Sequence, residues 1–144
     1  MKQSAIYLFV LLLVCVYSAS AVAAEERPKE VKILRAALDK DGVQRVEVVG
    51  GGYFFDPNRI IVMVNLPVEL KVRKEPGVVP HDIVMNSPEA GMDFRVSMHE
   101  EPQIIRFTPN KAGIYPFYCS RKLLFFESHR EKGMEGVLEV VEQH

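Results

Sequence analysis

Short segments in which apolar and polar residues alternate recur along this chain. The clearest is residues 68–74 (VELKVRK), and looser alternation is found at residues 43–49 and 94–98. A period of two predicts strands that bury one face. Turn residues separate the segments, as at residues 50–52 (GGG) and 108–113 (TPNKAG). Seven or eight short strands at this spacing predict an all-β protein with a Greek-key β-sandwich.

The first 24 residues have a different composition from the rest. Lys2 is followed by an uncharged, mostly apolar or small stretch, residues 4–24, which ends in AVAA before Glu25. This pattern predicts a secretory signal peptide, residues 1–24, and therefore a periplasmic or secreted protein without a stable membrane anchor after cleavage. An uncleaved anchor is the alternative, because the apolar stretch approaches spanning length.

The mature chain has room for one domain. Residues 25–42 are expected to form a polar leader and a first strand or hairpin. Residues 31–38 fit either a helical face or a strand, and the turn at residues 39–42 (DKDG) favours a hairpin. Residues 43–144 are expected to form the main domain, since 120 mature residues suffice for one core. A net charge of −1 for the full chain argues against nucleic acid or an anionic membrane as partner.

Cys119, His129 and Met134 follow one another within a single segment, residues 113–136. Removal of the signal peptide with Cys15 leaves Cys119 as the only cysteine. An unpaired thiol in an oxidising compartment is a disulfide partner, a reactive group or a metal ligand. Thiolate, imidazole and thioether together favour copper, and blue-copper sites add a second imidazole. His81 is the best candidate for it, although each of these residues alone also fits an ordinary structural role.

Three features resemble the cupredoxins, small blue-copper β-sandwich proteins. They are His81 after a proline, the run GIYPFYC at residues 113–119, and GMEG before a last strand. The resemblance implies a plastocyanin- or pseudoazurin-like fold with one copper per chain, held by His81, Cys119, His129 and Met134. It also implies a one-electron carrier, not an enzyme, with a redox partner such as a cytochrome or oxidoreductase. The dinuclear copper A form is excluded, because Leu123 stands where it needs a second cysteine.

The chain departs from plastocyanin-like members at three places. The residue after the first histidine is Asp82 where Asn is common, and nine residues separate Cys119 from His129 where two are usual. The insertion, residues 121–128, is expected to form a short helical turn with its leucine and phenylalanine side chains packed over the site. Apolar residues beside an exposed edge of His129 would form a docking patch. Glu127 is the third departure, since it could replace Met134 as in the red-copper relative nitrosocyanin.

Other functions remain open at this stage. A copper storage or delivery protein would exchange Cu(I) readily, whereas a carrier holds both oxidation states. Copper nitrite reductases also have a long loop after the cysteine, but they need a second copper site with three histidines. Only His99 and His144 remain for it, and both are expected to be solvent-exposed residues that bind no metal.

Overall fold

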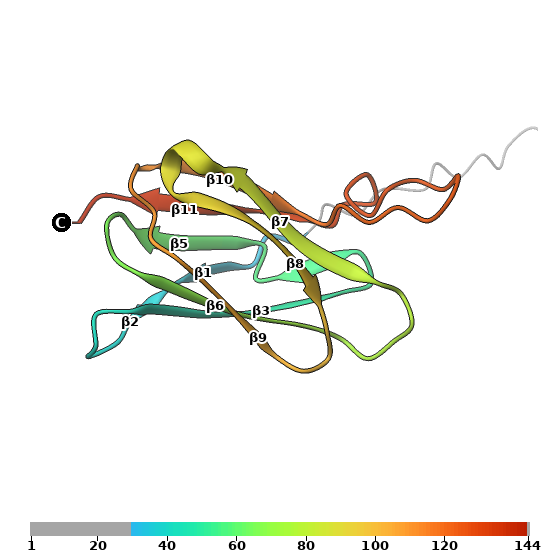
Figure 1. Ribbon diagram of the computed structural model, residues 1–144, viewed down its shortest axis with the longest axis horizontal. Coiled ribbons are helices and arrows are strands. Elements are labelled where there is room, and N and C mark those ends of the chain that lie inside the picture. Colours follow the sequence, from blue (N-terminus) through green and yellow to red (C-terminus); the bar gives the residue numbers. More distant parts are fainter. Residues whose placement is uncertain (1–29, 144) are drawn as a thin grey trace, which may run out of the picture.

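The computed structural model describes residues 30–143, which form two β-sheets packed face to face (Figure 1). The six-stranded sheet has the order β1-β5-β11-β10-β7-β8. The five-stranded sheet follows the path β2-β3-β6-β9, with β4 paired to β3. The strands are β1 (Ile33–Arg35), β2 (Ala37–Leu38), β3 (Gln44–Gly51), β4 (Phe54–Asp56), β5 (Arg59–Met63), β6 (Val68–Lys74), β7 (His81–Ser87), β8 (Met92–Met98), β9 (Gln103–Phe107), β10 (Gly113–Tyr118) and β11 (Glu135–Val141).

The predicted all-β sandwich is confirmed. The strands outnumber the seven or eight predicted, because edge strands such as β1, β2 and β4 are too short to show a period of two. The predicted signal peptide, residues 1–24, and His144 lie outside the described residues. Within residues 30–143, no helix is both long enough and apolar enough to cross a membrane.

The core lies between the two sheets. Strand β3 pairs in parallel with β6, so that Val46 lies beside Leu70 and Val48 beside Val72, and all four side chains are buried. Strands β5 and β11 of the other sheet bury alternate residues in the same way. Apolar side chains from both inner faces therefore fill one layer, which gives a rigid frame for the loops.

The N-terminal segment extends both sheets. Strand β1 pairs in parallel with β5, whereas β2 pairs with β3 across the turn at residues 39–43. The turn is closed by hydrogen bonds from the Asp39 N–H to the Val43 carbonyl and from the Gly42 N–H to the Asp39 carbonyl. The hairpin favoured from the sequence is thus present, and the helical alternative for residues 31–38 is wrong.

The predicted helical turn in the insertion is also wrong. Residues 121–128 form a narrow hairpin closed by a bridge between Lys122 and Ser128, and the Phe126 N–H donates to the Leu123 carbonyl at 3.0 Å. The loop between β10 and β11 projects beyond the end of the two sheets (Figure 1). Its four apolar tip side chains are mostly exposed, and Phe125 is fully exposed. A helical turn with one apolar face is stable only when that face packs against another part of the protein, and here the apolar side chains are exposed instead.

Candidate metal centre

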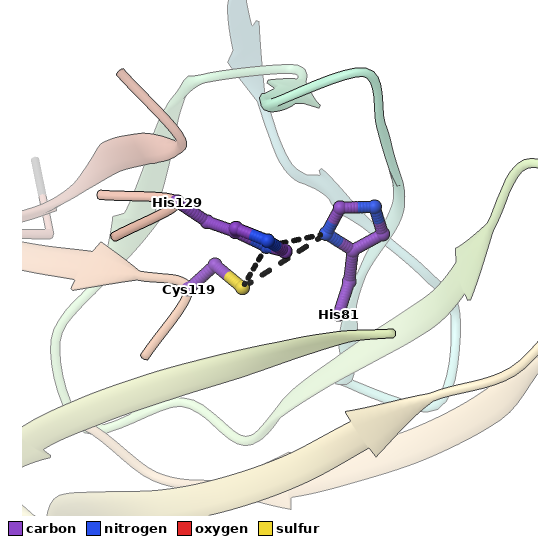
Figure 2. A group of neighbouring side chains, drawn as sticks. All are labelled: His81, Cys119 and His129. Carbon is purple, nitrogen blue, oxygen red and sulfur yellow. Dashed lines mark hydrogen bonds between the residues drawn. The ribbon is translucent and has the colours of Figure 1, made fainter. Parts of the chain in front are cut away.

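Three side chains from separate parts of the fold meet at one end of the sandwich (Figure 2). His81 is the first residue of β7, Cys119 directly follows β10, and His129 lies in the loop before β11. The strand thus begins at the ligand candidate itself, directly after Pro80. All three side chains are buried, and their ligand atoms lie within 4.8 Å of one another.

The distances within this group fit a single metal ion. The two histidine Nδ1 atoms are 3.1 Å apart, and Cys119 Sγ lies 3.5 Å from His129 Nδ1 and 4.0 Å from His81 Nδ1. Bonds of about 2.0–2.3 Å, as zinc makes to imidazole and thiolate, place three ligand atoms of a trigonal plane about 3.5–3.8 Å apart. Two imidazoles and one thiolate at this spacing match the equatorial ligands of a blue-copper site.

Burial prepares these groups to bind a cation. It lowers the pKa of His81, with the neighbouring His129 ring adding to the effect, and it also lowers the pKa of His129. Neutral rings are the ligand form, so both histidines are ready at neutral pH. Burial raises the pKa of Cys119, so the metal-free thiol keeps its proton and metal binding must release it.

Met134 is held directly beside the group. Its N–H donates to the His129 carbonyl at 2.8 Å, and its carbonyl accepts from the Cys119 N–H at 3.0 Å. Its side chain is fully buried, although its residue neighbours Glu135 and Gly133 are not. Hydrogen bonds of the Met134 backbone thus join it to His129 and Cys119, and its side chain is buried in the interior; its role as the fourth ligand stays a prediction.

Asp82 ties the two ligand segments together. Its carboxylate accepts hydrogen bonds from the N–H and the hydroxyl of Ser120, both at 2.6 Å, and its own N–H points to Cys119 Sγ at 3.5 Å. The side chain is only 2% exposed and lies 3.5 Å from Arg121 Nε. The Asp82 carboxylate thus joins the start of β7 to the residue that follows Cys119. It also adds a negative charge next to the thiolate.

Other candidates lie apart from the group. Glu127 and His99 are exposed, and neither belongs to the cluster. His129 is 3% exposed, so the expected exposed edge is wrong. One reason is that the ring of Tyr53 packs edge-to-face against the ring of His129, with the two centroids 5.0 Å apart.

Two residues near the site were missed in the sequence. Neither Tyr53 nor Met98, the last residue of the alternating segment 94–98, was predicted to lie near the metal site. Met98 is buried and lies opposite His81 in the β7–β8 ladder. Cross-strand neighbours on one face have Cβ atoms about 4.5–5.5 Å apart. This pairing depends on strand register, which local sequence does not specify.

No family model matches the sequence, and no curated protein matches it either. Solved structures do. The metal-binding domain of the Cu(I)-exporting P-type ATPase CopA of Streptococcus pneumoniae D39, solved with Cu(I), is 23% identical with a TM-score of 0.59. That match covers 78% of this chain and 99% of the domain.

Two further structures show how widely this fold is used. Auracyanin A, a blue copper protein of Chloroflexus aurantiacus, is 17% identical with a TM-score of 0.51, over 69% of this chain and 100% of that protein. The Cu-containing nitrite reductase of Thermus scotoductus SA-01 is 21% identical with a TM-score of 0.52, over 78% of this chain but 28% of that one. At these identities the likeness concerns the fold. Together with the His–Cys–His group, it points to copper as the metal.

Proposed function

We propose, from the premise that this chain has the cupredoxin fold, that it is a periplasmic or secreted one-electron carrier. One copper would be held by His81, Cys119, His129 and Met134. The observation that carries the proposal is the buried His–Cys–His group, whose ligand atoms lie 3.1–4.0 Å apart. The signal-like composition of residues 1–24 supports the location.

The chain's own residues suit such a carrier. Bound copper would supply the chemistry by taking up and releasing one electron. The sheets hold His81 and Cys119 at strand ends, and the backbone hydrogen bonds of Met134 fix the loop that bears His129. Buried ligands on a rigid frame change little between oxidation states, so reorganisation is small. Burial also keeps water away from the metal.

Titration of the purified protein with Cu(II) tests the proposal. We expect an intense visible thiolate-to-copper band and narrow hyperfine splitting in the electron paramagnetic resonance spectrum, saturating at one copper per chain. A reductant should bleach the band reversibly. A weak band with wide splitting, or binding of Cu(I) alone, would contradict a carrier function.

Asp82 is expected to lower the reduction potential. Its buried carboxylate stabilises Cu(II) more than Cu(I), because it adds negative charge beside the thiolate. Asp82→Asn should therefore raise the potential by roughly 20–80 mV, which corresponds to about 0.5–2 kcal/mol for one electron. Cyclic voltammetry measures the change, with the exposed Asp93→Asn on β8 as control. An unchanged potential in Asp82→Asn would show that Arg121 already cancels the charge, and a lower one would contradict the prediction.

The hairpin tip in the insertion is the proposed docking surface for the redox partner. It consists of Leu123, Leu124, Phe125 and Phe126, which are 60–100% exposed. At the base of the hairpin, the His129 N–H donates to the Arg121 carbonyl at 2.9 Å, so one hydrogen bond joins the hairpin to a proposed copper ligand. Exposed Lys122, Arg130 and Lys132 belong to the same loop between β10 and β11, where they outnumber the exposed Glu127 and Glu131. The surface therefore fits a protein with an apolar patch and an acidic rim.

Phe125→Ser should lower the bimolecular rate of electron transfer to the isolated partner by about tenfold, the cost of losing an exposed aromatic anchor. The rate of the unmodified protein should also fall as salt rises, because the basic residues steer the encounter. Stopped-flow absorbance of the copper band measures both effects. Ile114→Ser, an exposed residue at the start of β10, is the control. Equal rates for both variants, or no dependence on ionic strength, would refute this surface.

One observation favours copper storage or delivery as a second candidate. A Cβ added to Gly50 would lie 3.0 Å from Met98 Cε and 3.1 Å from Met134 Cε, so two thioethers meet beside the site. Sulfur-rich surroundings favour Cu(I). A storage or delivery protein should give up Cu(I) rapidly to a chelator, and Met98→Leu should weaken Cu(I) binding while leaving the Cu(II) band. Slow release of Cu(I), together with unchanged Cu(I) binding in Met98→Leu, would rule out storage or delivery and favour the carrier function.

A further inference from the structure

The hairpin turn between β3 and β4 carries an aromatic residue in an unfavourable conformation. Gly51 and Phe54 form the last pair of this hairpin, so Gly52 and Tyr53 are the two turn residues. Their φ angles are +51° and +64°. Two positive values define a type I′ turn, for which Asn, Asp and Gly are preferred. A bulky aromatic side chain at such a position costs stability, which raises the question of what its ring does.

The ring of Tyr53 lies against both histidines of the metal centre. Its centroid is 5.0 Å from that of His129 and 6.4 Å from that of His81, with interplanar angles of 75° and 83°. Edge-to-face contacts of this kind are favourable. The left-handed turn thus directs the ring toward the site.

Lys132 holds the same ring from the loop before β11. Its Nζ lies 4.5 Å from the ring centroid and 3.5 Å from the Tyr53 hydroxyl. A cation over a ring face is attracted to it. Tyr53 therefore connects three segments, namely the β3–β4 turn, the start of β7 and the loop that carries His129.

We propose that Tyr53 is a lid on the metal centre, a positioning residue that shields the two histidines and the Cys119 thiol from solvent and small ligands. Tyr53 is half-buried, whereas His81, Cys119 and His129 are all buried, and its ring contacts both histidines. The backbone strain is the cost of aiming that ring. This inference rests on the proposed function for the identity of the metal, but its main test does not.

The test compares thiol reactivity in the metal-free protein, in a Cys15→Ser background so that Cys119 is the only cysteine. Tyr53→Asn suits the turn but removes the ring. Alkylation of Cys119 by iodoacetamide should then become about tenfold faster, as expected when the ring contacts are lost. The thermal midpoint should stay the same or rise, because the strain is relieved. A merely structural side chain would instead lower the midpoint.

Three variants complete the design. Tyr53→Phe keeps the ring and should react as slowly as the unmodified protein, whereas Lys132→Met should give an intermediate rate. Asn65→Gly is the control at another residue of positive φ, +60°, in the turn after β5, and should leave the alkylation rate unchanged. With Cu(II) bound, azide should alter the visible spectrum of Tyr53→Asn at concentrations that leave Tyr53→Phe unaffected.

Equal alkylation rates in Tyr53→Asn, Lys132→Met and the unmodified protein would overturn the lid. A Tyr53→Phe variant as reactive as Tyr53→Asn would overturn it too, because the ring would then shield nothing. The proposed function fails separately, by the absence of a thiolate-to-copper band in the unmodified protein. The two failures are therefore distinguishable.

Discussion

Cys119→Ser abolishes the intense visible band expected of the copper-loaded protein. A serine hydroxyl does not provide the thiolate on which that band depends, and its oxygen is a harder donor than copper prefers in such sites. The loss of affinity should exceed the roughly 10–100-fold typical of changes to residues that merely support a metal ligand. Visible spectroscopy during copper titration measures both effects.

His99→Ala is the matched control for this variant. His99 is exposed and does not belong to the His–Cys–His group, so the band should survive its removal. Survival of the band in Cys119→Ser would refute the site, whatever the result for His99→Ala.

Gly136→Ala destabilises the protein by about 3 kcal/mol, because the interior has no room for one more methyl group. Gly136 pairs with Phe117 across β10 and β11, and an added Cβ would overlap the Phe117 ring and lie 2.5 Å from the Asn58 carbonyl oxygen. The Phe117 ring is fully buried and packs edge-to-face on Phe55 of the other sheet, with centroids 5.3 Å apart. Denaturant unfolding of the metal-free protein measures the loss.

Gly136→Ala should also perturb the metal centre, since the Phe117 ring that it displaces is two residues before Cys119. A shift of the ring alters the end of β10, so the visible band of any folded Gly136→Ala protein should move or weaken. Gly42→Ala is the control, because a Cβ there meets nothing within 4 Å and adds only the cost of a positive φ. Comparable losses of stability in the two variants would show that the close contact at Gly136 relaxes easily.

Much of the fold was predictable from local pattern. The segment at residues 68–74 was expected as a strand and is β6, since strict alternation leaves one apolar face that only a sheet can bury. The order His81, Cys119, His129 and Met134 identified the candidate ligands, because two imidazoles, one thiolate and one thioether together form the donor set of a blue-copper site. Residues 121–128 were predicted less well, since their apolar side chains suggested a packed helical turn and instead form an exposed hairpin tip.

The sequence alone therefore determined the longer strands, the sandwich and the donor types, because these depend on residue chemistry and on periods of a few residues. Only the tertiary structure decided which residues surround the metal centre. Met98 faces His81 through the register of β7 and β8, and Tyr53 covers His129 through the hand of a two-residue turn. Register and turn geometry are set by the packing of the two sheets as a whole, so no local stretch of sequence specifies them.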